Sequence, residues 1–455
     1  MGRLIFTFTS LAYCVDAPWG RGLPKEGFHR MAEVAHRRGV PVTWLVNAKS
    51  AEAFKRDLDD FHQRFGDDVG LVWGSSTATP GGTEGPVAEL ERVRRLFPWS
   101  RVSIVGSGQR SNEMVSELAE LGVEGLWGSC WEQIEIDEIT DRGAPWGTYY
   151  ISMQNFKAPA AAPAPLVSFE WTARDLCKSL HSGNPTIFSS DPNDVARADL
   201  VHGGDIAYWQ AMFDQYHRNL AHNDLVFFSM HQEAHEMEHS EVCHSYTPQE
   251  VADSAETMDT FFAHVQSRPG VELMTLPQAA DTYRRQNPHG TAPAYMLFDD
   301  IPTRPMAYWY TKGTPVGPWP RTFLYYDDAC QLAFIEGKFE PVLLRNYRGA
   351  TDPEDRYYFA ERDIPRVRLP YGKEMVESGE FEFAIESRKP LPFGLAFWYD
   401  FVSWRVREVQ GGAPPAGGAP PAGAAHWKLI EDKLLFARLD VRAGRTSVRV
   451  RLTRR

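Results

Sequence analysis

Short apolar runs alternate with amphipathic segments from Leu4 to Leu276 of this chain. The apolar runs are Leu4 to Ser10, Pro41 to Asn47, Val69 to Gly74, Arg101 to Gly106, Glu124 to Gly128, Leu166 to Trp171, Leu225 to His231 and Val271 to Leu276. Helical patterns lie between them, at Lys25 to Arg38, Pro86 to Phe97, Asn112 to Leu121, Ala207 to Ala221 and Pro248 to Ser267. Repeated βα units give parallel strands with right-handed crossovers, and so many units without a dinucleotide-binding fingerprint favour closure of the sheet. The pattern predicts an α/β fold, a TIM-like (β/α) barrel of seven or eight strands.

The hydrophobic period changes near Asn287. Beyond NPHGTAP come alternating, aromatic-rich runs that are typical of antiparallel strands, at Phe381 to Glu386, Gly394 to Phe401, Trp427 to Ile430, Leu434 to Val441 and Thr446 to Leu452. Residues 411–425 contain GGAPPA twice and predict a flexible Gly/Pro/Ala loop. We therefore expect a barrel domain over residues 1–290 and a mainly β domain over 291–455.

Length and charge restrict the classes of function. A chain of 455 residues is too long for one compact core, and its net charge of -12 argues against nucleic acid or an anionic membrane as the main partner. No apolar run is long enough to span a bilayer, and the segment after Met1 reads as a first strand instead of a signal peptide. The five cysteines are scattered without a CxxC pair, which predicts reduced thiols in a cytoplasmic protein. The sequence leaves the oligomeric state open.

Residues 225–245 are rich in groups that carry chemistry. An apolar strand ends at His231, and residues 231–245 contain four histidines and four glutamates. If a helix begins there, His231, His235 and His239 share one face, and His231 with His235 could hold a divalent metal such as zinc. The alternative is a solvated turn with no ligand role. The HExxH zinc-peptidase pattern is rejected, because Glu233 stands two places after His231 instead of one.

Polar and aromatic side chains follow most of the predicted strands. Because parallel strands bring their carboxyl ends to one edge, these side chains are expected to line one pocket. Indole faces stack on sugar rings and carboxylates bind hydroxyls, so the mixture predicts a carbohydrate site, although each tryptophan alone could be core. The candidates are Asp16, Glu132, His231 and Glu233 for catalysis, and Trp44, Trp73, Arg110, Trp127, Trp131 and Glu170 for substrate binding.

Several of these segments resemble the polysaccharide deacetylases of the nodulation type, in the wider glycoside hydrolase/deacetylase superfamily. LIFTFTSLAYCVD resembles the first strand of that family with its aspartate, DVGLVWGSST the strand that carries its second motif, VGSGQRSNEM its arginine motif, and LVFFSMHQE its last strand with a histidine. The resemblance implies an incomplete (β/α) barrel over residues 1–285 and a metal held by an aspartate and an HxxxH pair. Here Ser75, Ser76 and Thr77 stand in the second motif, and only Asp16 remains of the first.

Two functions of different classes follow. The first is a carbohydrate-active hydrolase, either a deacetylase with a relocated metal or a glycosidase that uses two carboxylates among Asp16, Glu132, Glu170 and Glu233. The second is a sugar-binding protein without catalysis that kept the barrel and lost the metal. The position of four ionisable groups at strand ends favours the enzyme.

Overall fold

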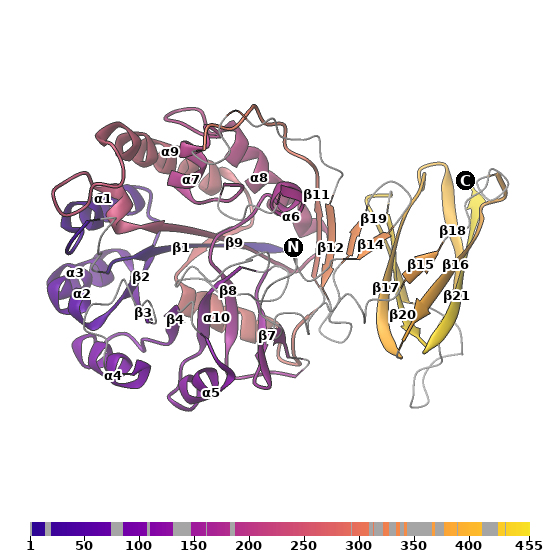
Figure 1. The fold of residues 1–455 in the computed structure, drawn as a ribbon, viewed down its shortest axis with the longest axis horizontal. Helices are drawn as coiled ribbons and strands as arrows, with labels where there is room; N and C mark the ends of the chain where they lie inside the picture. The colour runs from indigo at the N-terminus through magenta and orange to yellow at the C-terminus, as the bar shows by residue number, and fades with distance from the viewer. Residues whose placement is uncertain are drawn as a thin grey trace. The chain divides into compact units, whose positions relative to one another are not determined.

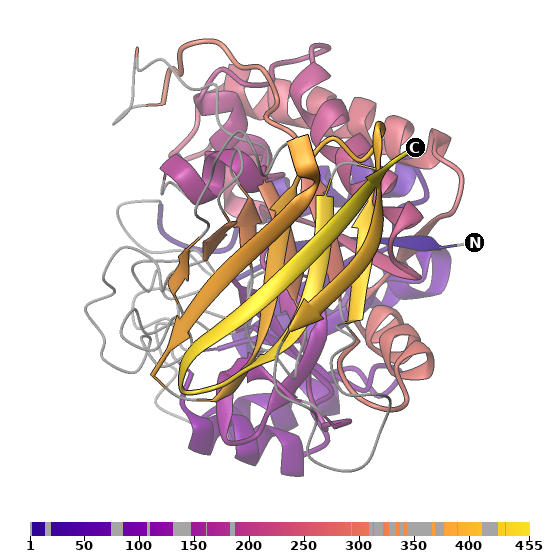
Figure 2. The same ribbon diagram turned by 90° about the vertical axis from the view of Figure 1, so that its right-hand side faces the viewer.

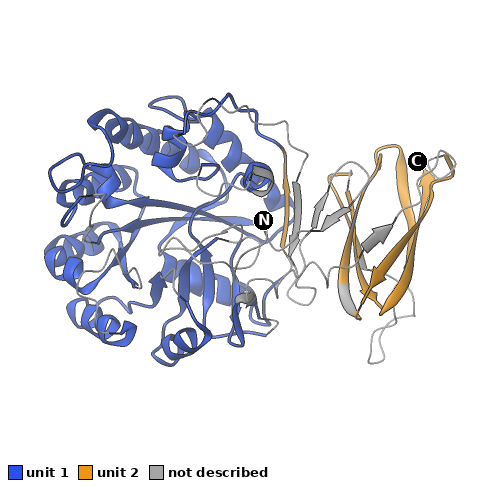
Figure 3. Ribbon diagram, in the orientation of Figure 1, with its two compact units in different colours: residues 1–292, 300–319 blue, residues 293–299, 320–455 orange. Residues whose placement is uncertain are grey.

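The fold is taken from a computed structural model, which describes residues 2–13, 20–73, 85–106, 110–130, 147–160, 162–182, 187–292, 294–308, 313, 322–326, 334–336, 341–343, 366–368, 377–388, 390–411, 426–432 and 434–455. The chain divides into two compact units (Figure 3). The first comprises residues 1–292 and 300–319, and the second comprises residues 293–299 and 320–455. Among the described residues, no helix is both long and apolar enough to cross a membrane.

The first unit is a mixed α/β structure built on a mainly parallel sheet (Figure 1). Its strands are β1 (Arg3–Leu11), β2 (Val42–Val46), β3 (Asp68–Val72), β4 (Ile104–Gly106), β5 (Gly125–Ser129), β6 (Tyr149–Ser152), β7 (Asn155–Pro159), β8 (Val167–Glu170), β9 (Leu225–Glu233) and β10 (Val271–Met274). Its helices are α1 (Lys25–Arg37), α2 (Ala48–Ala53), α3 (Lys55–Phe65), α4 (Pro86–Leu96), α5 (Asn112–Glu120), α6 (Leu176–Ser182), α7 (Pro192–Arg197), α8 (Ala207–Arg218), α9 (Pro248–Ser267) and α10 (Leu276–Gln286), with short 3-10 turns η1 (Asn219–Ala221) and η2 (Ala234–Met237).

The eight predicted strands of this unit are all present, with ends that differ by a few residues. β1 pairs in parallel with β9 on one side and with β10 and then β2 on the other, and the parallel series continues through β3, β4, β5 and β8. The hairpin of β6 and β7 was not predicted from the sequence.

The pairing of β8 bears on the predicted barrel closure. β6 pairs antiparallel with β8 at Tyr149↔Ser168 and Tyr150↔Val167, so the edge of β8 that faces away from β5 already has a partner. Beyond β8, the backbone N–H of Ala173 donates a hydrogen bond to Ser229 O of β9 at 2.7 Å. Closure of the sheet into a barrel stays a prediction.

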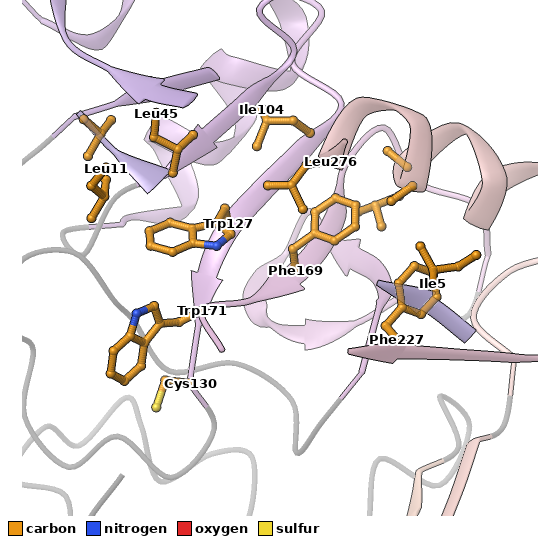
Figure 4. Close-up of a cluster of buried hydrophobic side chains, with 14 of the residues drawn as sticks. Ile5, Leu11, Leu45, Ile104, Trp127, Cys130, Phe169, Trp171, Phe227 and Leu276 are labelled. Carbon is orange, nitrogen blue, oxygen red and sulfur yellow. The ribbon is translucent and has the colours of Figure 1, made fainter. Parts of the chain in front are cut away.

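The two faces of the strands have different neighbours. On the outer face, Phe6 and Phe8 of β1 contact Phe262 of α9, and α7, α8 and α9 lie side by side over β1 and β9 (Figure 1). On the inner face, a buried apolar cluster includes Ile5, Leu45, Ile104, Trp127, Phe169 and Phe227 (Figure 4). Leu276, Ala279, Ala280 and Tyr283 of α10 belong to the same cluster, so α10 packs against the inner face.

Local sequence explains several helix starts. Thr247 caps α9 in a capping box with Glu250, and Pro248 occupies the first turn, where its missing N–H is not needed. Ser111 caps α5 through Met114 N, and α3 ends at Gly66, whose φ of 78° is left-handed. The sequence reading missed α2, α3, α6, α7 and α10, and all but α3 and α10 are shorter than eight residues. Short helices carry too few turns for a clear 3.6-residue pattern.

The second unit is composed of antiparallel sheets. Its strands are β11 (Ala294–Phe298), β12 (Thr322–Tyr326), β13 (Phe334–Glu336), β14 (Pro341–Leu343), β15 (Arg366–Arg368), β16 (Glu380–Ser387), β17 (Leu391–Trp398), β18 (Trp404–Gly411), β19 (His426–Ile430), β20 (Leu434–Val441) and β21 (Gly444–Arg454). One sheet has the order β15-β16-β21-β18 and another β17-β20-β19 (Figure 2). The β-rich character is as predicted, but β11 to β15 and β18 were not among the predicted strands. Residues 412–425 of the predicted flexible loop lie outside the described residues.

Candidate active site

The end of β9 carries the candidate site. Successive side chains of a strand alternate between faces, and His231 and Glu233 lie on the same face as Phe227 of the inner cluster. Register with β1 places His231 beside Thr9 and Glu233 beside Leu11, at the carboxyl end of the sheet. Parallel α/β folds place their ligands at this end.

The chain after His231 is not the predicted helix. β9 continues to Glu233, and the 3-10 turn η2 then brings His235 back onto the Glu233 side chain. His231, His235 and His239 therefore do not share a helical face, and His239 is exposed and contacts Tyr246 O at 2.6 Å. The sequence reading failed here because Tyr13, 220 residues away in the chain, provides one of the contacts that fix the Glu233 side chain.

Glu233 lies at the centre of a cluster of polar side chains. Its Oε2 accepts a hydrogen bond from Tyr13 OH at 3.0 Å and lies 2.9 Å from His235 Nδ1, and its Oε1 lies 3.9 Å from His231 Nε2. Burial by itself raises the pKa of Glu233, but the charges and hydrogen bonds of His235 and His231 outweigh it and hold the pKa well below its usual range. Glu233 is therefore ionised at neutral pH.

His235 is the cationic partner of Glu233. Burial lowers the pKa of His235, whereas the charge of Glu233 and its hydrogen bond raise it, and the net direction is upward. Tyr13 also meets the His235 ring edge-to-face, with ring centroids 6.2 Å apart. The imidazole therefore favours its protonated form, which keeps the Glu233 carboxylate in its charged form.

A second carboxylate lies in the same turn. Glu236 accepts hydrogen bonds from Gln232 Nε2 at 2.6 Å and Tyr246 OH at 2.8 Å. Burial and the negative charge of Glu233 raise the pKa of Glu236 to about 7. Two carboxylates close together in the chain are thus driven in opposite directions, and Glu236 holds a proton in part of its population at neutral pH.

Two further acids from α7 extend this cluster, and the sequence reading missed them. Asp191 caps α7 through Asn193 N and Asp194 N, each at 3.2 Å, and Tyr308 OH donates to Asp194 at 3.2 Å. Burial, followed by the charges of Asp194 and Glu236, raises the pKa of Asp191 well above its ordinary value. Asp191 before Pro192 is a recognisable helix start, but nothing in that pattern shows that the helix end lies beside β9.

Aromatic rings surround His231, which is 1% exposed. The centroid of its ring lies 5.0 Å from that of Trp127 in β5 and 6.0 Å from that of Trp171, which follows β8. The guanidinium of Arg174 lies over the Trp171 ring at 4.7 Å and donates to Cys130 Sγ at 2.9 Å. His231 therefore lies next to two indole rings as well as near Glu233.

The structure places the other predicted site residues differently. Trp127 lies in β5, Glu170 ends β8, and Arg110 precedes α5 and donates to Trp127 O and to Ser129 Oγ. Trp73, at the end of β3, is half-buried, and its backbone N–H donates to Gly106 O. Asp16, Trp131 and Glu132 lie outside the described residues.

Trp44 lies away from these residues. Its ring is fully buried against Phe28 of α1 and Phe61 of α3, and its Nε1 donates to Asp67 at 2.6 Å. It therefore points into the helical layer, and the expectation that Trp44 lines the substrate pocket is not supported. The error has a physical reason, since the preceding Thr43 and the following Leu45 occupy the inner face and neighbouring strand residues alternate.

The contacts of His231 and His235 bear on the predicted zinc site. A tetrahedral zinc site needs neutral imidazole nitrogens, a free carboxylate lone pair and usually three protein ligands. Here His235 Nδ1 and Tyr13 OH already contact Glu233 Oε2. Within the described part of the chain, no group of three or more His, Cys, Asp or Glu side chains is arranged to hold a metal ion. The described residues fit an acid–imidazole cluster and do not by themselves fit a zinc site.

Comparisons with known proteins give matches in structure only. No protein-family model and no curated protein sequence matches the chain. A probable polysaccharide deacetylase from Pseudomonas aeruginosa PAO1 is 12% identical with a TM-score of 0.41, over 63% of this chain and 93% of that chain. A putative polysaccharide deacetylase from Mycobacterium smegmatis is 13% identical with a TM-score of 0.40, over 64% and 94%.

A third neighbour spans both units. The 4-alpha-glucanotransferase from Thermococcus litoralis is 10% identical with a TM-score of 0.37, and the match covers 99% of this chain and 100% of that chain. TM-scores this low do not establish a common fold. The functional interpretation therefore depends on the residues of this chain.

Proposed function

We propose that this chain is a carbohydrate-active hydrolase in which Glu233 and Glu236 perform acid–base catalysis. The observation that carries the proposal is the opposite perturbation of the two carboxyl groups, with the pKa of Glu233 lowered and that of Glu236 raised to about 7. Neighbouring carboxyls whose pKa values are driven apart are the usual arrangement of an acid and a base. Glu233 is the ionised base or nucleophile, and Glu236 is the general acid.

The chemistry requires only these two groups and a water molecule. Glu233 takes a proton from water as the water oxygen attacks the substrate, and Glu236 gives its proton to the leaving oxygen or nitrogen. The same transfers serve the cleavage of a glycosidic bond and the removal of an acyl group, so both members of the hydrolase class remain within the proposal. His235 keeps Glu233 ionised, and His231, 3.9 Å from Glu233 Oε1, is placed to orient the carboxylate or to move a proton.

Three features support a carbohydrate as the substrate. Carboxylates and tryptophans gather at the carboxyl end of the strands, as sugar sites require. The half-buried Trp73 offers an indole at the end of β3. The first and last strands resemble those of polysaccharide deacetylases, whose substrates are glycans. Zinc remains a predicted cofactor that the assay below tests directly.

The test is an assay of the full chain on unmodified and acetylated oligosaccharides, with zinc or with a chelator. Reducing ends report glycosidase activity and free acetate reports deacetylation. Glu233→Gln keeps the shape of the side chain and removes its charge, and we expect turnover to fall by roughly 100-fold or more. Glu241→Gln is the matched control, because Glu241 is an exposed glutamate eight residues further along the chain.

The outcomes separate the candidates. Loss of activity in Glu233→Gln but not in Glu241→Gln supports the proposal, and the product identifies the bond that is cleaved. If no glycan yields a product while sugars still bind, the protein is a carbohydrate-binding protein without catalysis. Activity that requires added zinc and survives Glu233→Gln would contradict the roles given to the two carboxylates.

A further inference from the structure

In the described part of the chain, the indole nitrogens of Trp127 and Trp171 are buried donors without an acceptor. Trp127 is 0% exposed and Trp171 is 4% exposed. Within the described part of the chain, both Nε1 atoms are buried and neither has a hydrogen-bond partner. Buried polar groups in native proteins are nearly always hydrogen-bonded, so two such donors in one place require an explanation.

Both indoles lie beside the candidate catalytic groups. Their rings contact the same His231 ring, which is followed two residues later by Glu233. Figure 4 shows the nitrogen of Trp171 on the edge of its ring that faces Trp127. The two indoles therefore come from β5 and from the residue after β8, and both rings lie next to His231 near the end of β9.

Other buried tryptophans of the same unit behave differently. Trp209 is as buried as Trp127, but its Nε1 donates to Ser189 O at 3.1 Å, and Trp44 Nε1 donates to Asp67. The fold therefore satisfies indole donors where they serve packing. The two unsatisfied donors are the ones that lie next to His231.

The charge of the surroundings restricts what these donors accept. Glu233 lies in the same cluster as His231, and Glu236, Asp191 and Asp194 lie in electrostatic contact with it. The ionised Glu233 carboxylate would repel a negatively charged ligand group, and the Arg174 guanidinium over the Trp171 ring already donates to Thr172 O and Cys130 Sγ. An indole N–H is a neutral donor that suits an uncharged oxygen, such as a hydroxyl or ring oxygen of a sugar.

We propose that Trp127 and Trp171 form a binding subsite for an uncharged sugar unit, in which the two indole N–H groups donate to its oxygens. The proposal rests on the proposed function and adds a substrate class to it, since it selects neutral sugars over uronic acids. Trp127 and Trp171 are assigned to substrate binding, and the proton transfers stay with Glu233 and Glu236.

The experiment is a titration of the full chain, labelled with nitrogen-15 at its tryptophans, with neutral methyl hexosides and with methyl glucuronide. The hexosides are the glucoside, galactoside, mannoside and N-acetylglucosaminide. Trp127→Phe and Trp171→Phe assign the indole signals and remove one donor each. We expect at least one neutral hexoside to shift both signals, with affinity about 3- to 10-fold weaker in either variant, the value of one hydrogen bond. Methyl glucuronide should bind more weakly than the glucoside.

Trp209→Phe is the matched control. It removes an equally buried indole whose N–H has a protein acceptor, so it should lose stability while its affinity for the hexoside stays that of the wild type. Trp127→Phe and Trp171→Phe should show the reverse. If either variant fails to fold, the indole shifts of the wild type, with the Trp209 signal as the internal reference, still decide the question.

The results separate this subsite from the proposed hydrolase. No indole shift with any neutral hexoside, or unchanged affinity in both folded variants, overturns the subsite. Tighter binding of the glucuronide overturns its selectivity for neutral sugars. A hexoside that shifts both signals in a protein whose turnover is insensitive to Glu233→Gln supports the subsite and contradicts the hydrolase assignment.

Discussion

Asp67 and Glu233 are two acids of the same unit, and each is paired with a histidine and an aromatic side chain. Asp67 is 1% exposed and binds three groups, Val42 N at 3.0 Å, Trp44 Nε1 at 2.6 Å and His36 Nε2 at 2.9 Å. Glu233 has a side chain that is 13% exposed, two close partners on Oε2, and His231 at 3.9 Å from Oε1. An acid whose bonds are all made within the protein connects elements, whereas one with a loosely held oxygen and some exposure can still bind a substrate.

Replacing the histidine beside each acid should separate the two roles most strongly. We expect His231→Ala to reduce turnover by roughly 100-fold or more, because a group that moves protons or orients the base contributes that much. His36→Ala should lower stability and leave turnover per folded molecule unchanged, since its ring stacks on Phe65 at 3.8 Å, away from β9. Steady-state rates and urea unfolding of both variants measure this. Equal rates in His231→Ala and the wild type, with the fold intact, would make His231 a packing residue.

Replacing Asp67 should lower stability and leave turnover unchanged. Asp67→Ala leaves a backbone N–H and an indole N–H buried without acceptors, and we expect a loss of about 2–4 kcal/mol in the free energy of unfolding. Asp67→Asn keeps an acceptor oxygen and should lose less. Urea unfolding measures the loss, and turnover per folded molecule should hold. A fall in turnover in a variant that remains fully folded would show that Asp67 and the site at β9 are coupled.

The sequence predicted the elements of the first unit better than the contacts between them. β9 was expected to begin at Leu225 and end at His231 because apolar periodicity is local, and it begins there and continues two residues further. The turn after it was not predictable, because its geometry depends on Tyr13 and His235 meeting one carboxylate. Glu236 and Asp191 were missed for the same reason, since only tertiary packing brings them together. Trp44 shows the limit of strand-end reasoning, in which a shift of one residue exchanges the inner face for the outer.

Glu236 should make the free energy of unfolding depend on pH. Its pKa in the folded protein is about 7 and exceeds its ordinary value, so the folded state binds this proton more tightly than the unfolded state does. The resulting stability is present below about pH 4.5 and is lost as pH rises through about 7, with a size of about 3 kcal/mol at roughly 1.4 kcal/mol per pKa unit. Asp191, Asp194 and His235 also have raised pKa values and add to the same trend.

Glu236→Gln should therefore reduce, without abolishing, the fall in unfolding free energy between pH 5 and 8, roughly the window of the shifts above. Urea midpoints across this window at constant ionic strength measure the slope. Activity should also fall above pH of about 7 in the wild type, because the general acid loses its proton. A slope that is the same in the variant and the wild type would mean that the pKa of Glu236 is not raised.

The smallest expected effects come from the two tyrosines that bind the two carboxylates. Tyr13 OH donates to Glu233 and stabilises its charged form, so Tyr13→Phe should raise the pKa of Glu233. Activity that depends on ionised Glu233 then fails at a higher pH on the acidic side of the profile. At neutral pH the rate should fall only about 3- to 10-fold, the value of one hydrogen bond that positions the carboxylate.

Tyr246→Phe is the matched variant, because Tyr246 OH donates to Glu236 at 2.8 Å. Removing this bond raises the pKa of Glu236, so the general acid keeps its proton to a higher pH and the basic side of the profile moves upward. One hydroxyl deletion should thus move the acidic side of the pH–rate profile and the other the basic side. If both variants move the same side of the profile, or if neither variant moves either side, then Glu233 and Glu236 do not divide the roles of base and acid. In that case Glu233 is a structural acid like Asp67, despite the difference in exposure between the two side chains.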